Sequence, residues 1–286
     1  MRFLGVDMGG TGTRWATSDG SRGESAGATG LVFDAAARSA FEAALAPMRA
    51  DGPFAGAYLG VTGAGFEDDP TLRTLAGAVL GLPAESVTIV NDMVLAWQAV
   101  WPEGGGHLVA AGTGSVGFSM EGGVTLVGGR GTLIDDGGSG AWIALRALDA
   151  LWRLIDDDSA PKGAEILADA VFGAIGGSDW EATRRHVYGG DRGAIGRLAR
   201  PVAEAAHLGD PLALELMARA GGELARLARA LVARAGEAPV AVIGGVLPLH
   251  PEIRTAMEAG TPGIALTFPT PDAPATAARL AKELAR

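Results

Sequence analysis

A strand, a glycine/threonine turn and a returning strand occur together twice in this sequence, and this repeat constrains the fold more than any other feature. The two copies read Gly5-Val6-Asp7-Met8-Gly9-Gly10-Thr11-Gly12-Thr13 and Val109-Ala110-Ala111-Gly112-Thr113-Gly114-Ser115. Their threonines lie about a hundred positions apart, a spacing typical of duplicated domains rather than of short solenoid repeats. The sequence therefore predicts two equivalent halves.

The segments around the repeat alternate between strand-like and helix-like patterns, which is typical of an α/β layer architecture. We expect strands at residues 2–6, 15–18, 56–61, 86–90, 108–111, 116–120 and 240–243. We expect helices at residues 35–48, 71–80, 92–100, 141–155, 164–172, 194–207, 211–235 and 275–284.

The glycine-rich stretch at residues 102–106 is the best candidate for a linker between the halves. We therefore expect one domain at residues 1–102 and a second at residues 103–286, the second with helical insertions. The final helix, at about 272–286, is free to pack back on the first domain.

Composition excludes several classes of function. The 286 residues carry a net charge of -10, which argues against nucleic acid as a partner. Cysteine is absent, which excludes disulfides, thiolate metal sites and cysteine nucleophiles.

No apolar run reaches the roughly 18 residues of a membrane span, and no charged leader precedes the first strand. We expect a soluble, cytoplasmic protein without a membrane partner; its oligomeric state stays open, with a homodimer as one option.

The two lysines of the chain, Lys162 and Lys282, stand outside the Gly-Lys-Ser/Thr step of a P-loop. A nucleotide site must therefore bind phosphate without lysine. Glycine turns suit this task because they let backbone N–H groups approach an anion, and threonine adds a hydroxyl donor. A single turn of this kind is more often a simple hairpin, whereas two turns facing one another could clamp a polyphosphate.

Two aspartates stand at the ends of predicted strands. Asp7 is either a turn former or a carboxylate for Mg²⁺, a cation that prefers oxygen ligands. Asp92 follows an apolar run and begins a predicted helix. It is therefore either an N-cap, together with Asn91, or a general base at the carboxyl end of a strand. The residues alone leave both pairs of alternatives open.

A glycine-dense loop at residues 128–140 precedes a predicted helix and contains Arg130 and Asp136. Carboxylates there could accept hydrogen bonds from sugar hydroxyls, and Arg130 could hold an anion or orient a carboxylate. Alternatively, Asp136 and Ser139 cap the helix. Further along, Gly244-Gly245 follows a strand; bare backbone at that point would let a flat base lie close, although a plain strand-to-helix turn explains it equally well.

From Gly5 to Ala278, the order of these segments resembles the superfamily of sugar kinases, heat-shock ATPases and actin. Within it, the chain is most similar to the bacterial glucosamine kinases and the N-acetylglucosamine kinases. It shares with glucosamine kinases a Gly-Gly-Arg loop at residues 128–130, an Asp-x-Gly-Ser-Gly-Ala segment at residues 136–141 and a helix start at residues 209–213. The resemblance implies an α/β fold of two duplicated actin-like (ribonuclease H-like) domains, with a nucleotide and sugar cleft between them.

The resemblance also implies a role for each matching position. Asp92 matches the family's catalytic base, and Asp7 matches its magnesium-linked carboxylate. The nucleotide-binding positions are Gly9, Gly10 and Thr11 in the first phosphate loop, Gly112, Thr113, Gly114 and Ser115 in the second, and Gly244 and Gly245 beside the adenosine. Gly129 and Asp136 match sugar-contacting positions, and Arg130 adjoins them as a substrate-binding candidate.

The implied reaction is an ATP- and Mg²⁺-dependent transfer of the γ-phosphate to the 6-hydroxyl of a sugar, glucosamine or N-acetylglucosamine, with Asp92 as general base. Three departures bear on the substrate. Arg130 stands where N-acetylglucosamine kinases carry a Trp, Gly137 replaces an acidic residue, and residues 26–30 lack an Asn found in many relatives. The acidic composition mildly favours a cationic sugar such as glucosamine.

Alternatives to this function remain. One is a kinase of another hexose or amino sugar, and another is a non-catalytic regulator that binds ATP and sugar. Acyl-CoA reductase activators share the phosphate loops, but they hold an iron–sulfur cluster through cysteines, and this chain has none.

Overall fold

The computed structural model describes residues 1–285, which form two compact units. Unit 1 comprises residues 1–104 together with the C-terminal segment from Thr270 onward, and unit 2 comprises Gly105–Pro269. The C-terminal segment thus lies with unit 1, whereas the expected division at residue 102 assigns it by chain order to the second domain. No helix in the described part of the chain is long and apolar enough to cross a membrane.

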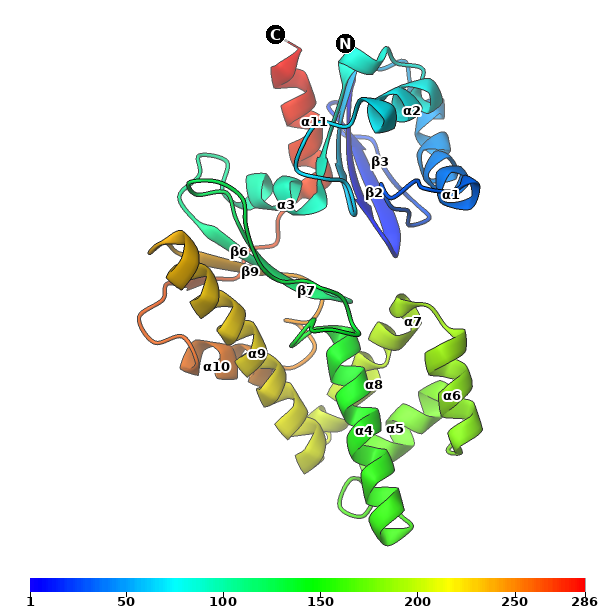
Figure 1. Ribbon diagram of the computed structural model, residues 1–286, viewed down its shortest axis with the longest axis vertical. Helices are drawn as coiled ribbons and strands as arrows, with labels where there is room; N and C mark the ends of the chain where they lie inside the picture. Colours follow the sequence, from blue (N-terminus) through cyan, green and yellow to red (C-terminus); the bar gives the residue numbers. More distant parts are fainter. Residues whose placement is uncertain (286) are drawn as a thin grey trace. The chain divides into compact units, whose positions relative to one another are not determined.

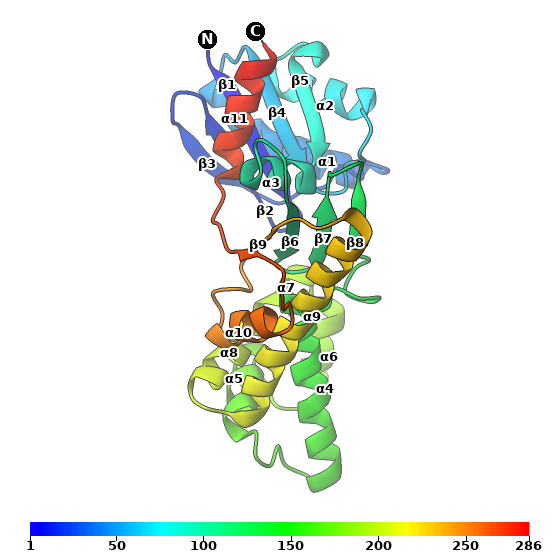
Figure 2. The ribbon, with the colours of Figure 1, turned by 90° about the vertical axis from the view of Figure 1, so that its left-hand side faces the viewer.

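Unit 1 is built on a five-stranded sheet in the order β3-β2-β1-β4-β5 (Figures 1 and 2). The central strand β1 pairs antiparallel with β2 and parallel with β4, and β5 continues the parallel side. The strands are β1 (Phe3–Gly9), β2 (Gly12–Thr17), β3 (Arg22–Ser25), β4 (Gly56–Val61) and β5 (Val87–Asn91). The helices are α1 (Ala35–Leu45), α2 (Pro70–Leu80), α3 (Asp92–Val100) and α11 (Ala273–Leu284), with short 3₁₀ helices η1 (Ala46–Asp51) and η2 (Ala84–Ser86).

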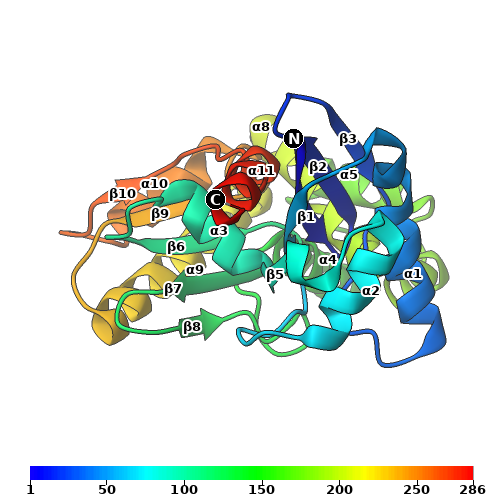
Figure 3. The same cartoon turned by 90° about the horizontal axis from the view of Figure 1, so that it is seen from above.

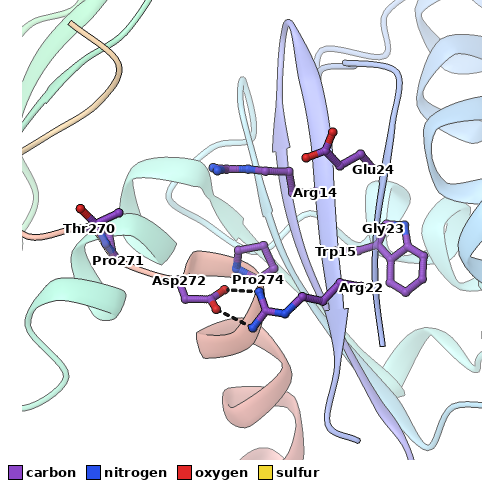
Figure 4. A pocket seen from close by; sticks show the side chains of 9 residues that line it. All are labelled: Arg14, Trp15, Arg22, Gly23, Glu24, Thr270, Pro271, Asp272 and Pro274. Atoms are coloured by element: carbon purple, nitrogen blue, oxygen red, sulfur yellow. Dashed lines mark hydrogen bonds and ion pairs between the residues drawn. The ribbon is translucent and has the colours of Figure 1, made fainter. Parts of the chain in front are cut away.

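Helix α11 lies along β1 and β4 in unit 1 (Figure 2). The contact is close because Gly5 has no side chain: a Cβ at that position would stand 2.1 Å from the backbone nitrogen of Ala278. Asp272 fixes the start of the helix. Its carboxylate accepts a hydrogen bond from the Ala275 N–H at 3.1 Å and forms a two-pronged ion pair with Arg22 on β3, at 3.1 and 2.6 Å (Figure 4).

Unit 2 contains a second five-stranded sheet in the order β10-β9-β6-β7-β8 (Figure 3). Read from β8, this order and its strand directions repeat those of the first sheet: β6 pairs antiparallel with β7 and parallel with β9. The predicted duplication and the α/β class are therefore confirmed. The strands are β6 (His107–Ala111), β7 (Ser115–Ser119), β8 (Thr125–Gly128), β9 (Val240–Ile243) and β10 (Leu266–Thr267).

The helices of unit 2 pack mainly around one long helix, α9, whose buried face includes Leu216, Leu224 and Leu231. Asp210 caps this helix and also accepts a hydrogen bond from the backbone of Leu167, which ties α5 to α9. The helices are α4 (Gly140–Asp158), α5 (Glu165–Ile175), α6 (Trp180–Gly189), α7 (Arg192–Arg197), α8 (Ala199–His207), α9 (Pro211–Ala235) and α10 (Pro251–Ala259). Helices α4 to α8 form the expected helical insertion (Figure 1).

The candidate functional site

Three polar side chains gather at the carboxyl ends of adjacent parallel strands in unit 1. Met8 on β1 pairs with Val61 on β4, and Val61 pairs with Asn91 on β5. Asp7, Thr62 and Asp92 each lie within one residue of this row. Parallel strands present their carboxyl ends at the same edge of a sheet, which is where ligands of open α/β folds bind.

The structure separates the two roles that the sequence leaves open for Asp92. Asn91 is the N-cap of α3: its side-chain oxygen accepts a hydrogen bond from the Met93 N–H at 2.9 Å, and its amide donates to the Ala64 carbonyl at 2.6 Å. Because Asn91 caps the helix, Asp92 in the first turn is available for another role.

The surroundings of Asp92 raise the pKa of its carboxyl group. Burial is the largest cause, and repulsion from the Asp7 carboxylate acts in the same direction. A hydrogen bond from the Thr62 hydroxyl and backbone N–H groups oppose the shift in part. A half-buried carboxylate with a raised pKa, held in place by a hydroxyl, has the properties expected of a general base.

Asp7 lies opposite Arg14 on β2, and the two side chains form an ion pair with 2.6 Å between Arg14 Nη2 and Asp7 Oδ2. Within residues 1–285 no three acidic or histidine side chains come together as a metal site. Mg²⁺ in phosphate-transfer sites is commonly held by one or two carboxylates, waters and the substrate phosphates. A single carboxylate beside the first glycine/threonine loop, the predicted phosphate loop, therefore fits such an ion.

The first glycine/threonine loop is the turn of the β1–β2 hairpin. Gly9 pairs with Gly12, which leaves Gly10 and Thr11 exposed at the tip. The segment after β3 packs against this tip: a Cβ on Gly27 would stand 2.5 Å from the Gly10 carbonyl oxygen. The tip therefore offers backbone N–H groups and one hydroxyl to an anion.

The second loop occupies the same place in unit 2. Ala111 on β6 pairs with Ser115 on β7, with Gly112, Thr113 and Gly114 between them. The start of α4 holds this loop, since the first N–H groups of the helix donate to the carbonyls of Gly112 at 2.8 Å and Thr113 at 3.2 Å. The Ser115 hydroxyl is buried and donates a hydrogen bond to the Gly137 carbonyl at 2.7 Å.

Gly244 and Gly245 follow β9, the parallel neighbour of β6, so they lie beside the second loop. Gly244 has a φ of 117°, and a Cβ there would stand 2.2 Å from the Ala111 carbonyl oxygen. Only glycine fits this position. The structure thus brings both predicted nucleotide-binding segments of unit 2 to one edge of its sheet.

The loop after β8 is organised by Asp135, a residue that the sequence analysis did not single out. Its carboxylate accepts a hydrogen bond from the Arg130 N–H at 2.9 Å and forms an ion pair with the Arg130 guanidinium at 3.1 Å. Burial raises the pKa of Asp135, but these bonds and one from the Asp136 N–H outweigh it and bring the pKa below its ordinary value. Gly129, with a φ of 71°, is the exposed corner of this loop.

Asp136 is buried, with 2% of its surface exposed, and its backbone is left-handed, with a φ of 52°. Its Oδ2 atom accepts hydrogen bonds from Arg192 at 3.0 Å and from the Thr132 hydroxyl at 3.3 Å. It does not cap α4, because Ser139 is the N-cap. The carboxylate lies against the second glycine/threonine loop: a Cβ on Gly114 would stand 2.9 Å from Oδ2.

Four further residues complete these groupings without having been predicted: Thr62 at Asp92, Arg14 at Asp7, Arg192 at Asp136, and Glu223 of α9. A Cβ on Gly137 would stand 2.6 Å from the carboxylate of Glu223, so an acidic side chain of α9 lies beside this glycine. For Arg14 a sequence signal existed, since it stands two residues past the turn, opposite Asp7; the other three come from distant segments.

The repeated sheet order, with a glycine/threonine turn at the same place in each unit, defines an actin-like protein with the two-domain α/β fold of sugar kinases. Residues 4–258 match the BadF/BadG/BcrA/BcrD ATPase family, and the chain belongs to that family.

Solved structures with this fold include two candidate N-acetylglucosamine kinases. The protein from Chromobacterium violaceum is 28% identical over 98% of each chain, with a TM-score of 0.74. The protein from Porphyromonas gingivalis is 19% identical, with 99% of this chain and 98% of that chain covered and a TM-score of 0.77. A ROK family glucokinase from Streptomyces griseus, solved with glucose and AMPPNP, is 20% identical over 99% of this chain and 100% of its own, with a TM-score of 0.60.

Proposed function

We propose that the protein is an ATP-dependent amino-sugar kinase that phosphorylates the 6-hydroxyl of glucosamine or N-acetylglucosamine. The observation that carries the proposal is the environment of Asp92. This residue is half-buried after β5 and its carboxyl pKa is raised, while Asn91 rather than Asp92 caps α3. The 28% identity to a candidate N-acetylglucosamine kinase, over nearly the whole of both chains, supports an amino sugar as acceptor.

In the proposed reaction the ionised carboxylate of Asp92 accepts the proton of the sugar 6-hydroxyl as that oxygen attacks the γ-phosphorus. The new oxygen–phosphorus bond forms while the bond from the γ-phosphorus to the bridging oxygen breaks, and ADP leaves with that electron pair. The Thr62 hydroxyl orients Asp92. The products are a sugar 6-phosphate and ADP.

Each unit contributes to phosphate binding in this proposal. Unit 1 supplies Gly9, Gly10 and Thr11, and unit 2 supplies Gly112, Thr113, Gly114 and Ser115, with Gly244 and Gly245 for the adenosine. Backbone N–H groups replace the lysine of a P-loop in stabilising the transferred group. Asp7 would hold Mg²⁺, which when bound neutralises charge on the phosphates.

The sugar-side assignments rest on the loop after β8. We assign Gly129 and Asp136 as sugar contacts. Arg130 remains a substrate-binding candidate, and its pairing with Asp135 ties its position to the conformation of this loop. A guanidinium already paired with a carboxylate suits hydrogen bonding to hydroxyls better than capture of a free anion.

The direct test is ADP release by the purified protein with glucosamine, N-acetylglucosamine, glucose, N-acetylmannosamine and N-acetylmuramic acid. Sugar-dependent ADP release with an amino sugar is expected. Preference for glucose would favour a hexokinase, the first alternative. Measurable ATP binding without turnover of any sugar would favour a non-catalytic regulator.

A further inference from the structure

Arg192 is the first residue of α7 and reaches from the helical insertion to the loop after β8. Its Nη2 lies 3.0 Å from Asp136 Oδ2, and its Nε donates to the Thr132 hydroxyl at 3.3 Å. The Thr132 hydroxyl in turn donates to the same Oδ2 atom. A cation in the first turn of a helix gains nothing from the helix dipole. The contact with Asp136, rather than helix stability, therefore explains an arginine at this position.

The two side chains of this ion pair differ in burial, and the difference indicates the role of Arg192. The Asp136 side chain is 3% exposed, whereas the Arg192 side chain is 63% exposed. A carboxylate that deep in the protein is costly unless a cation or several donors compensate it. Arg192 supplies that compensating charge while remaining largely in solvent, so the pair as a whole carries no net charge.

The same short helix also contacts the second phosphate loop. A Cβ on Gly196, in the last turn of α7, would stand 3.1 Å from the methyl group of Thr113. The Asp136 carboxylate, which Arg192 contacts, lies against Gly114 of that loop. Helix α7 therefore contacts the predicted sugar-contacting carboxylate through Arg192 and the predicted phosphate loop of unit 2 through Gly196.

We propose that Arg192 sets the charge selectivity of the acceptor site, so that the enzyme favours an uncharged sugar over one that carries an ammonium group. The inference rests on the proposed kinase function and on Asp136 as a sugar contact. A carboxylate paired with a guanidinium still accepts hydrogen bonds from sugar hydroxyls. It offers no net charge to hold an ammonium group, and the guanidinium repels one. Within the amino sugars, this predicts the N-acetylated form over the free amine.

The test compares kcat and KM of wild type and Arg192→Gln for glucosamine, glucose and N-acetylglucosamine. The variant should raise the glucosamine-to-glucose ratio of kcat/KM by about tenfold, equivalent to ~1.4 kcal/mol. The change should fall mainly on the KM of the sugar and leave the KM of ATP near its wild-type value. Arg192→Lys keeps the positive charge and should keep the wild-type ratio. Arg197→Gln, on the same helix, is the matched control and should also leave the ratio unchanged.

A second measurement uses wild-type protein alone and so does not depend on the folding of a variant. The glucosamine-to-glucose ratio of kcat/KM should rise with pH as the amine of glucosamine loses its proton. Preference of the wild type for glucosamine over the neutral sugars at low pH would overturn the inference, as would an unchanged ratio in Arg192→Gln. If the wild type phosphorylates sugars but either result appears, only the role of Arg192 fails; if it phosphorylates none, the proposed function fails with it.

Discussion

At the scale of single residues, the fold raises the pKa of the Asp92 carboxyl group by burying it beside the Asp7 carboxylate. In the same environment, the ionised carboxylate destabilises the folded protein. Burial raises the pKa of Asp92, so the unfolded chain loses this proton at lower pH than the folded one does. Above the folded pKa the buried negative charge lowers stability, and below the ordinary value of 3.8 this cost disappears.

Replacing Asp92 with Asn should therefore have two opposite effects. Turnover should fall by about 10²- to 10⁴-fold because the proposed general base is lost, with ATP affinity nearly intact. Stability at pH 7 should rise because the buried charge is gone, and the gain should vanish as pH falls toward 3.8. Steady-state kinetics and thermal unfolding at several pH values measure both. Asp158→Asn, at an exposed position on α4, should change neither, and near-normal turnover of Asp92→Asn would leave Asp92 with a purely structural role.

His250 gives a second residue-scale prediction. Its Nδ1 caps α10 by accepting a hydrogen bond from the Glu252 N–H at 3.2 Å, which only the neutral ring can do. Burial lowers the pKa of His250, and His207, whose ring centroid lies 4.5 Å away, lowers it further, against an opposing effect of Glu252.

The neutral form is thus favoured in the folded protein, so the unfolded chain takes up this proton first as pH falls below 6.5. Stability should decline over that range and level off below the folded pKa. His250→Asn keeps a capping acceptor without titrating, so chemical denaturation of this variant should show a smaller loss between pH 7 and pH 5. An identical pH profile in both proteins would show that His250 does not contribute.

Single site residues could be predicted from the sequence, but their partners in distant segments could not. Asp7, Asp92 and Asp136 could be selected because each stands beside a strand end or a glycine loop. Their partners could not: Thr62 follows β4 whereas Asp92 begins α3, and Arg192 lies 56 positions from Asp136. A pattern in one segment carries no information about which distant side chain meets it.

At the scale of elements, the predicted strands β4 and β9 and helices α3 and α9 match the structure at both ends. Other elements have no apolar pattern to reveal them. Strand β3 reads Arg-Gly-Glu-Ser and exists because it pairs with β2 at the sheet edge. The predicted helix at residues 194–207 is instead two helices. Helix α7 begins at Arg192, after the Asp191 cap, and ends at Arg197, and α8 begins at Ala199.

The packing of α11 on β1 depends on Gly5 and gives an element-scale prediction. Gly5→Ala should lower the free energy of unfolding by ~3 kcal/mol, because its Cβ would collide with the backbone of α11 at both Pro274 and Ala278. Gly173→Ala, in α5, is the matched control: its Cβ would have open space, and alanine favours the helix. Urea denaturation measures both, and a Gly5→Ala protein as stable as wild type would contradict the assigned packing of α11.

At the scale of the whole molecule, the duplication was readable because the turn chemistry recurs with its flanking strands. The second sheet repeats the order and directions of the first, and the inserted helices α4 to α8 extend only unit 2. The match to the ATPase family over residues 4–258 shows the family, and the likeness to solved sugar-kinase structures agrees with this fold. We propose that the acceptor sugar is selected instead by a few side chains such as Arg130 and Arg192, whose contacts the sequence did not reveal.

The central claim is phosphate transfer to a sugar 6-hydroxyl, and the position of the phosphate in the product tests it most directly. Wild-type protein incubated with ATP, Mg²⁺ and N-acetylglucosamine should yield a product whose phosphorus couples to the C6 protons in NMR spectra, and the 6-deoxy sugar should yield none. Phosphate on another hydroxyl, or no sugar phosphate despite measurable ATP binding, would contradict the account.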